Sequence, residues 1–305
     1  MASSRQSASL FDVQGIVAVV TGGGSGLGRF MTQALAENGA KRVYIIGRRK
    51  QVLEDAVKQI GLDNVIPLQC DVTNPENLKA AALFIENDVG YINLIVANSG
   101  IAGPSGDVPP NATITEVQDA LLNIPVEDFT NTYHVNCTAV FYTAIAFLHL
   151  LDKGNKSGYQ GGRSQLIATS SIGSFNRKIT AGFAYGTSKA ATTMMFKVLA
   201  TYLVPYRIRA NVLCPGCEYY NYSEQNNVEL TSLVFPTDLT TSLIDGDDPT
   251  AEGAFPLDQI PAERAGMPED IMGPLLYLAS RAGAYCNGNC VLTDGGRLSV
   301  TPATY

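Results

Sequence analysis

The stretch TGGGSGLG, residues 21–28, stands between a strand pattern and a helix pattern. The apolar run IVAVVT (16–21) leads into it, and the helical pattern that follows continues to Glu37. Glycines let a backbone turn tightly and approach a ligand, and a helix N-terminus offers unpaired N–H groups and the positive end of a dipole. A glycine-rich turn after the first strand of an α/β array is typical of a pyrophosphate site. We therefore assign to phosphate binding the residues Gly22, Gly24, Ser25, Gly26, Leu27 and Gly28.

Apolar runs and helical patterns alternate along the rest of the chain. The apolar runs lie at 16–21, 42–47, 64–71, 92–100, 164–171, 207–216 and 289–296. The first two helical patterns follow the first two strands and end at Glu37 and Ile60. The others lie near 75–88, 126–152, 184–204 and 268–281. Continuous apolar strands separated by helices predict a parallel sheet that is covered on both faces. We expect an α/β fold, a doubly wound (Rossmann) parallel sheet of about seven strands, as a single domain over residues 1–305.

Composition excludes several classes of partner. The 305 residues carry a formal net charge of -7, so no basic field exists to attract nucleic acid or an anionic membrane surface. No apolar run approaches the roughly 20 residues of a membrane span, and the polar N-terminus lacks a secretory pattern. We expect a cytoplasmic protein whose six cysteines are reduced.

Three connections are longer than usual, at 101–125, 152–163 and 217–262. In the first, Thr115 followed by Gln118 predicts a capping box that opens a short helix. The third contains many apolar and aromatic residues, which a bare linker would lack. We therefore expect 217–262 to form a lid over the substrate.

The end of the second strand indicates which dinucleotide is bound. An acidic residue there would hydrogen-bond the adenosine ribose, whereas this chain has Gly47, Arg48, Arg49 and Lys50. Arginine binds a phosphate monoester through two donors. The sequence predicts NADP(H), with Arg48 as the main contact and Arg49 in support, and Asp71 at the end of the third strand facing the adenine.

Tyr185 and Lys189 lie four residues apart and so on one face of a helix. An ammonium that close lowers the pKa of a phenol from about 10 toward neutrality, as proton transfer to a carbonyl oxygen requires. The fifth strand ends in Thr169, Ser170 and Ser171, which offer a hydroxyl at the same edge of the sheet.

Six motifs stand in a fixed order along the chain. They are TGxxxGxG at 21–28, Asp-Val at 71–72, Asn136 in YHVNCTAVF, Ser-Ser at 170–171, YxxxK at 185–189, and Asn211 with Pro-Gly at 215–216. In this order they resemble the short-chain dehydrogenase/reductase family, over nearly the whole chain from Phe11 to Leu298. The YGTSKAA helix and the segment 261–296 look most like the branch of rhamnolipid-type β-ketoacyl reductases and their fungal relatives.

The resemblance implies a role for each catalytic residue. Tyr185 would be the general acid in reduction, and Lys189 would lower the pKa of Tyr185 and hold the nicotinamide ribose. Ser171 would hydrogen-bond the substrate carbonyl, and Asn136 would anchor a water that links Lys189 to solvent. Helix 184–204 would pack against its mate in another subunit, which predicts a homo-oligomer, a dimer or a tetramer. Further cofactor contacts would come from Val72, Asn98, Gly100, Pro215 and Gly216.

The chain departs from the family pattern in three places. Ala97-Asn98-Ser99-Gly100 replaces Asn-Asn-Ala-Gly, and Tyr220 stands where a threonine often contacts the carboxamide. Ser171 lies fourteen residues before Tyr185, one more than the family pattern, so Ser174 is the alternative hydroxyl.

Cysteines in CPGC (214–217) and CNGNC (286–290) could form a redox pair or a zinc site. We expect Cys214 to end one strand and Cys290 to begin an interior one, so their thiols should lie at opposite ends of a parallel pair. His134 and His149 are fifteen residues apart on the predicted helix 126–152, too far to share an ion. We therefore expect no metal.

These observations together predict an NADPH-dependent oxidoreductase (EC 1.1.1.-) that reduces the ketone of a fairly large apolar, acyl- or polyketide-like small molecule. A second hypothesis stays open. The chain would keep the NADP(H)-binding fold but use its pocket for imine reduction or for a non-redox cyclisation or scaffold role in secondary metabolism.

Overall fold

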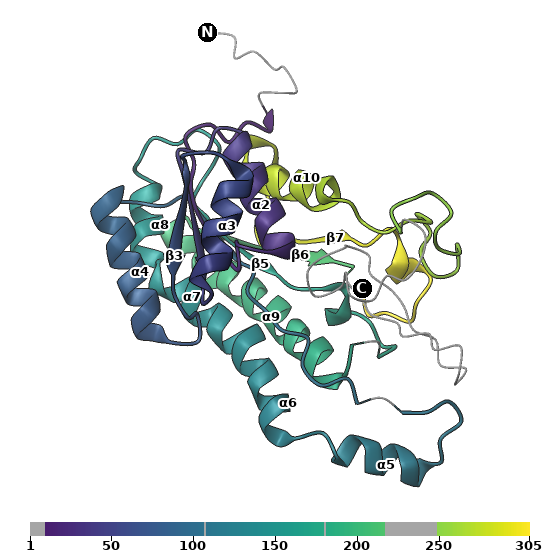
Figure 1. Cartoon of the computed structure of the whole chain (residues 1–305). Helices are drawn as coiled ribbons and strands as arrows, with labels where there is room; N and C mark the ends of the chain where they lie inside the picture. The colour runs from purple at the N-terminus through teal and green to yellow at the C-terminus, as the bar shows by residue number, and fades with distance from the viewer. Residues whose placement is uncertain (1–9, 107, 180, 217–248) are drawn as a thin grey trace.

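Seven parallel strands form one sheet, in the order β3-β2-β1-β4-β5-β6-β7 (Figure 1). The computed structural model describes residues 10–106, 108–179, 181–216 and 249–305. The strands are β1 (Val17–Thr21), β2 (Arg42–Gly47), β3 (Val65–Gln69), β4 (Leu94–Ala97), β5 (Gln165–Thr169), β6 (Arg209–Pro215) and β7 (Cys290–Thr293). The order reverses between β1 and β4, which makes this a doubly wound α/β fold in a single domain and confirms the prediction.

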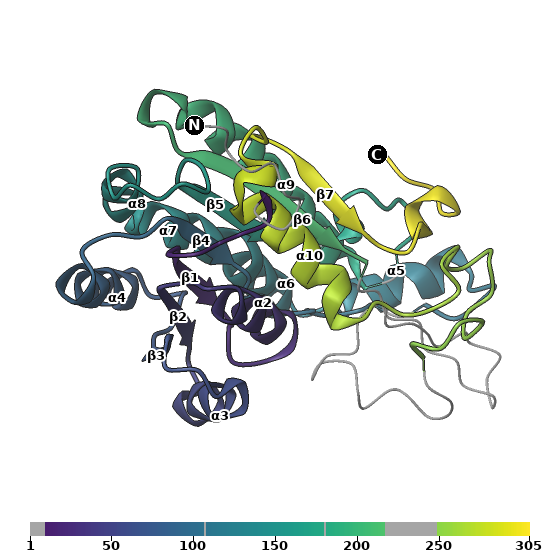
Figure 2. The same ribbon diagram turned by 90° about the horizontal axis from the view of Figure 1, so that it is seen from above.

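Helices cover both faces of the sheet, as Figure 2 shows from above. One face is packed by α4 (Pro75–Asp88), α7 (Ala139–Ala146), α8 (Leu148–Gly154) and α9 (Phe183–Tyr202). The other face is packed by α2 (Gly26–Glu37), α3 (Lys50–Ile60) and α10 (Pro268–Ala279). Because both faces are covered, the strands are mostly apolar, and β1, β4 and β5 are buried at every position.

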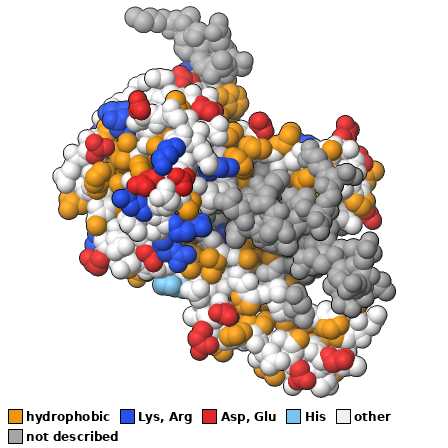
Figure 3. Space-filling view, in the orientation of Figure 1, with side chains coloured by type: hydrophobic (Ala, Val, Ile, Leu, Met, Phe, Trp, Pro, Cys, Tyr) orange, Lys and Arg blue, Asp and Glu red, His pale blue; other side chains and the backbone are white. Residues whose placement is uncertain are grey.

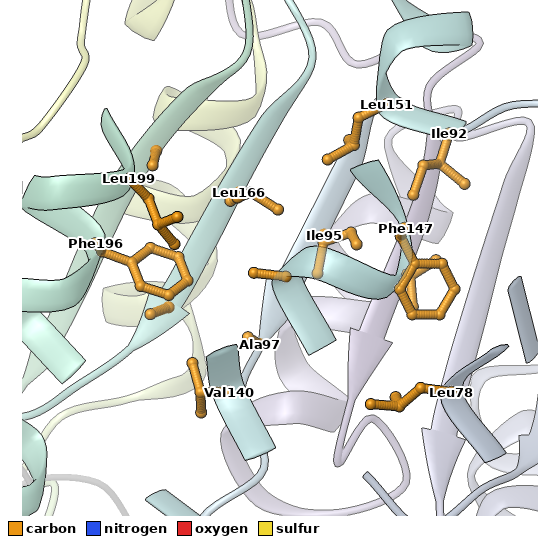
Figure 4. Close-up of a cluster of buried hydrophobic side chains, with 14 of the residues drawn as sticks. Leu78, Ile92, Ile95, Ala97, Val140, Phe147, Leu151, Leu166, Phe196 and Leu199 are labelled. Carbon is orange, nitrogen blue, oxygen red and sulfur yellow. The ribbon is translucent and has the colours of Figure 1, made fainter. Parts of the chain in front are cut away.

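The larger buried cluster lies between the sheet and α4, α7, α8 and α9 (Figure 4). Phe147 and Phe196 are fully buried and pack with strand residues such as Ile95 and Leu166. This packing fixes α7 and α9 on the sheet, and with them the side chains that both helices carry to the carboxyl ends of the strands.

The segment predicted as one long helix at 126–152 is divided, which corrects that prediction. It consists of α6 (Val126–Tyr133), a π-helical turn (His134–Thr138), α7 and α8. Phe147 has φ -109 and ψ 6, outside the helical range, and α8 bends away by 49°. The amide of Ile92 donates to Leu150 O at 3.1 Å, so the bend lets α8 pack at the start of β4.

A short helix occurs in the 101–125 connection, as predicted, but two residues earlier. Helix α5 (Ile114–Leu122) has a capping box formed by Thr113 and Glu116, not by Thr115 and Gln118. None of the residues of α5 is buried. Of the predicted lid at 217–262, residues 217–248 lie outside the described residues, and in the remainder Ile260 is buried and Phe255 packs on the core.

Within the described ranges, no single helix is long and apolar enough to cross a membrane. The bent pair 126–146 and 148–154 meets the length and composition criteria together, and its Leu150 and Leu151 are buried in the core cluster.

Candidate active site

A cavity of about 460 Å³ lies at the carboxyl ends of the strands, where the sheet order reverses. Fourteen of the predicted cofactor-binding residues line it, namely Gly22, Gly24, Ser25, Gly26, Leu27, Arg48, Arg49, Asp71, Val72, Asn98, Gly100, Tyr185, Lys189 and Pro215. The predicted residues Gly28, Asn136, Ser171 and Gly216 do not line it.

The glycine-rich turn presents the start of α2 to this cavity. Ser25 is the N-cap of α2 but makes no side-chain hydrogen bond to the first turn, and Ser25, Gly26 and Leu27 all line the cavity. The N–H groups of this turn, with the positive end of the α2 dipole, can therefore receive an anion. A Cβ on Gly28 would lie 2.2 Å from Gly22 O, so only glycine there lets the helix come so close to the turn.

Thr21 and Asn98 hold the turn in place. Thr21 Oγ1 accepts from the backbone N–H groups of Asn98 at 2.9 Å and Ser99 at 3.0 Å. Asn98 Nδ2 donates to Thr21 O at 3.0 Å. The sequence Ala97-Asn98-Ser99-Gly100 thus keeps the asparagine that ties β4 to the turn, and Ala97 itself is buried in the core.

At the far end of the cavity, Asp71 lies between basic groups. Burial alone would raise the pKa of Asp71, but hydrogen bonds from the hydroxyl and amide of Thr73 and the charge of Arg48 hold it below its usual value. Arg48 and Arg49 are exposed, and within the described part of the chain neither forms an ion pair with a carboxylate. Lys and Arg side chains gather on this face of the molecule (Figure 3). The arrangement can receive a second anion at the end of β2.

Tyr185 and Lys189 face the cavity from the first turns of α9. Lys189 is buried, its Nζ donates to Thr169 O at 2.9 Å, and the same atom lies 5.7 Å from the centroid of the Tyr185 ring. The carbonyl end of β5 therefore holds the ammonium beside the phenol, as the one-turn spacing predicted.

The loop between β5 and α9 contains the 3₁₀ turn η2 (Ile172–Ser174), which begins directly after Ser171. Ser171 is buried, and its Oγ accepts from Gly173 N at 3.0 Å. A Cβ on Gly173 would lie 3.3 Å from Ser171 Oγ and 3.5 Å from Tyr185 Cε1, so hydroxyl and phenol ring flank the same small space. Ser174 Oγ donates to Ser171 O at 2.7 Å. The geometry favours Ser171 over Ser174, because a hydroxyl that accepts one hydrogen bond keeps its O–H for donation.

Asn136 stands in the π-helical turn between α6 and α7, and its side chain is buried. Its Oδ1 accepts from Ile101 N at 2.8 Å, and its Nδ2 donates to Ile101 O at 2.9 Å and to Ser188 Oγ at 3.1 Å. The amide thus joins the loop after β4 to α9, close to Lys189. Its expected link to a water stays a prediction.

Pro215 lines the cavity, and Gly216 packs behind it. A Cβ on Gly216 would lie 2.6 Å from Asp294 Cβ and 3.4 Å from Ile172 Cδ1, so glycine lets the end of β6 fit between β7 and η2. Tyr220 and Cys217 lie outside the described residues.

The prediction that the thiols of Cys214 and Cys290 lie at opposite ends of a strand pair is wrong. Strand β7 is an edge strand, and its first residue, Cys290, pairs with Val212, only two positions before Cys214. The two thiols hydrogen-bond, which raises the pKa of buried Cys214 and lowers the pKa of Cys290 to about 7. The error arose because the short β7 overlaps only the last part of β6.

No group of three or more potential metal ligands occurs within the described residues, and the cysteines described there are free. His134 and His149 lie on separate helical segments, since the predicted helix is divided.

Besides Thr169 and Ser170, which the sequence placed at this edge of the sheet without a cofactor role, the cavity is lined by residues that sequence reasoning did not assign to the site, namely Gly47, Val52, Leu53, Cys70, Thr73, Ser99, Ile101, Ala102, Val135 and Ala181. Many of these residues are neighbours in sequence of a motif residue at the carboxyl end of a strand. Their position at a strand end could therefore have indicated that they line the cavity. Val135 and Ala181 come from helical and loop segments whose approach to the cavity depends on tertiary packing.

A family model for short chain dehydrogenases matches residues 16–227. The chain belongs to the short-chain dehydrogenase family. The short-chain dehydrogenase/reductase PhomF of Diaporthe leptostromiformis is 42% identical over 300 residues, covering 98% of this chain and 96% of its own. The rhamnolipids biosynthesis 3-oxoacyl-[acyl-carrier-protein] reductase of Pseudomonas aeruginosa is 28% identical over 289 residues, covering 94% and 97%.

Among solved structures, the Pseudomonas aeruginosa RhlG/NADP active-site complex superposes with a TM-score of 0.75 at 25% identity, covering 94% of this dehydrogenase and 98% of that chain. The resemblance to the rhamnolipid-type branch and to fungal short-chain dehydrogenases is thereby confirmed.

Proposed function

We propose that this short-chain dehydrogenase uses NADPH to reduce the ketone of a fairly large apolar, acyl- or polyketide-like small molecule, with Tyr185 as the proton donor. The observation that carries the proposal is the set formed by Lys189, Tyr185 and Ser171 beside a cavity whose other end holds Arg48. Oxidoreduction is the chemistry of the family, whereas the ketone, the substrate class and the preference for NADPH are the parts proposed.

The residues that line the cavity suit a dinucleotide phosphate in their chemistry. The first turn of α2 would receive the pyrophosphate, Arg48 and Arg49 the 2′-phosphate, and Asp71 and Val72 the adenine. Pro215, with Gly216 packed behind it, would wall the nicotinamide. When bound, the cofactor supplies the hydride.

The residues of the chain would position the carbonyl and supply the proton. Ser171 would donate its O–H to the substrate oxygen, and Tyr185 would transfer its proton to that oxygen as negative charge develops there. Lys189 would stabilise the resulting phenolate, since its ammonium is fixed by Thr169 O and lies near the ring. Asn136 would keep this arrangement by holding the loop at Ile101.

The substrate class is proposed from the wall of the cavity near Tyr185. Ile101, Ala102, Val135 and Ala181 line it, and all four are apolar. The name of the Pseudomonas relative, a 3-oxoacyl reductase, supports an acyl ketone. The composition of 217–262 supports a lid over such a substrate, and deletion of 225–250 should weaken substrate binding while leaving cofactor binding intact.

The proton donor is tested with Tyr185→Phe. The variant should bind NADPH with the affinity of the wild type but reduce ethyl 3-oxohexanoate and longer 3-oxo esters at least roughly 100-fold more slowly. Unchanged turnover in the variant would exclude ketone reduction by this route and leave imine reduction or a non-redox role as the better hypothesis.

The cofactor preference is tested by fluorescence titration of NADPH and NADH against wild type and Arg48→Ala. Loss of one charge-assisted contact, worth about 1.5–3 kcal/mol, should weaken NADPH binding roughly 10- to 150-fold and leave NADH binding unchanged. Equal affinity of the wild type for both cofactors would refute the preference.

We also propose a homo-oligomer, a dimer or a tetramer, formed through α7 and α9, which cover the same face of the sheet. Seven large hydrophobic side chains of these helices are exposed, namely Phe141, Tyr142, Ile145, Phe183, Met194, Val198 and Tyr202. Sedimentation velocity should find an oligomer for the wild type and a monomer for Met194→Glu with Val198→Glu. A monomeric wild type would contradict the proposal.

A cytoplasmic location is proposed from the free state of the described cysteines, which suits a reducing compartment. Fluorescence microscopy of the tagged protein in its own cell would test it.

A further inference from the structure

The last five residues, 301–305, lie along the loop that follows η2. Ala303 forms an antiparallel bridge with Asn176, and Arg177 N donates to Pro302 O at 2.8 Å. The C-terminus therefore lies at the carboxyl end of the sheet (Figure 1), the end at which the lining residues of the cavity stand.

Thr304 and Tyr305 both contact Phe175 in that loop. Thr304 donates twice to Phe175 O, from its backbone N at 2.8 Å and from its Oγ1 at 3.1 Å. The ring of Tyr305 packs edge-on against that of Phe175, with centroids 5.0 Å apart and planes at 68°. Phe175 is buried under these contacts.

Phe175 and Ser171 are the two caps of the same 3₁₀ turn. Ser171 accepts from Gly173 N at the start of η2, and Phe175 follows its last residue, with Phe175 N donating to Ile172 O at 2.9 Å. A carbonyl at the end of a helical turn has no partner within the turn, and here the C-terminal tail supplies two donors to it. The tail thus fixes one end of a turn whose other end carries the candidate catalytic hydroxyl.

The turn also packs directly on α9. A Cβ added to Gly173 would contact both Ser171 Oγ and the Tyr185 ring, so there is little free space between the turn and the phenol. A Cβ added to Gly186 of α9 would lie 3.3 Å from Gly173 O. A shift of η2 would therefore change the distance between the hydroxyl of Ser171 and the phenol of Tyr185.

Hydrogen bonds also hold the start of the tail at the end of β7. Thr301 Oγ1 donates to Arg297 O at 3.0 Å, and Asp294 Oδ2 accepts from Leu298 N at 2.9 Å. Arg297 is buried. The tail therefore connects a fixed strand end to η2.

We propose that Thr304 and Tyr305 are positioning residues, which hold η2 so that Ser171 and Tyr185 address the same substrate oxygen. The inference rests on the proposed reduction, because it assigns to the tail an effect on that reaction. A misplacement of about 1 Å in a catalytic group can cost roughly 100-fold in rate.

The test compares wild type, deletion of 304–305, Thr304→Ala and Thr304→Ser, with Val300→Ala as a control at an exposed position just before the tail. Turnover of ethyl 3-oxohexanoate with NADPH gives kcat and KM, and fluorescence titration gives the NADPH Kd. Deletion should lower kcat roughly 10- to 100-fold and Thr304→Ala roughly 3- to 10-fold, with the NADPH Kd unchanged. Thr304→Ser keeps the hydroxyl and should restore kcat, and Val300→Ala should equal the wild type.

A second measurement does not depend on turnover. Hydrogen–deuterium exchange of the peptide 170–178 should rise in the deletion variant, while exchange of β1 and β4 stays unchanged. If the wild type reduces no ketone, the proposed function fails, and this exchange still shows whether the tail holds the turn. Unchanged exchange, unchanged kcat, or a loss of kcat that a weaker NADPH Kd accounts for would overturn the inference.

Discussion

Replacing Gly28 by alanine tests how the glycine-rich turn serves the cofactor site. The added Cβ would lie 2.2 Å from Gly22 O and 2.6 Å from Asn98 Nδ2, whereas real Cβ atoms essentially never come within 3.0 Å of such atoms. Both neighbours are fixed, since Gly22 N donates to Ile46 O at 2.7 Å and Asn98 Nδ2 donates to Thr21 O. Helix α2 must therefore move away from the turn by about 0.8 Å or more.

The substitution should lower two free energies, that of unfolding and that of NADPH binding. Overpacking of this kind destabilises a fold by about 1–3 kcal/mol, which lowers Tm by roughly 2–4 °C per kcal/mol in a chain of this size. Moving the N–H groups at the start of α2 away from a bound phosphate removes at least one charge-assisted hydrogen bond, worth about 1.5–3 kcal/mol. The NADPH Kd should rise roughly 10- to 150-fold.

The matched control is Gly154→Ala at the opposite end of the sheet. There the Cβ would lie 1.8 Å from Ile92 O, a more severe overlap far from the cavity. Differential scanning fluorimetry should find both variants destabilised, while fluorescence titration should find weaker NADPH binding in Gly28→Ala alone. Wild-type affinity in Gly28→Ala, or an equal loss of affinity in Gly154→Ala, would refute the reasoning.

Three further predictions concern stability and are read from urea unfolding. Thr21→Val removes the acceptor of two backbone N–H groups and should cost about 2–4 kcal/mol, whereas Thr21→Ser should cost less than about 1 kcal/mol; equal losses would contradict this role of the hydroxyl. The pKa of Asp270 is held below its usual value, chiefly by hydrogen bonds from Arg264. The ionised carboxylate therefore adds to the free energy of unfolding above about pH 4, and this stabilisation is lost as the pH falls further. Asp270→Asn should therefore be less stable than wild type at pH 7 by about 1 kcal/mol, and the difference should shrink as the pH falls below about 4; a difference that does not change with pH would speak against the ion pair. Arg209→Met should cost about 2–4 kcal/mol, because the buried guanidinium donates to the carbonyl oxygens of Gly283 and Cys286, and each oxygen would lose its charged donor and keep one neutral donor; a neutral result would show that water replaces the guanidinium.

The sequence predicted the parallel strands, the glycine-rich turn before α2 and the one-turn spacing of Tyr185 and Lys189, because each depends on a local pattern. It missed the division of helix 126–152, since the apolar pattern continues through Phe147 with neither proline nor glycine. That bend is set by the packing of α8 beside the start of β4, a tertiary contact that no local pattern records.

Two other errors have equally specific causes. Thr113 and Thr115 are each followed three residues later by Glu or Gln, so the pattern offered two overlapping capping boxes, and the carboxylate of Glu116 favours the first through the helix dipole. The contact between Cys214 and Cys290 depended on strand register, which composition does not fix. The hydrogen bonds of Asn136 to Ile101 and of Thr304 to the residue after η2 could not be predicted from the sequence, because the partners lie far apart along the chain.

The position of Tyr305 has a practical consequence for handling the protein. Its ring packs on Phe175, one residue beyond the turn that Ser171 caps, so any peptide fused to the C-terminus must leave the molecule beside that turn. An affinity tag placed there would compete with the terminal contacts of the chain itself. Activity measured on such a fusion should be compared with that of the same chain after the tag has been removed.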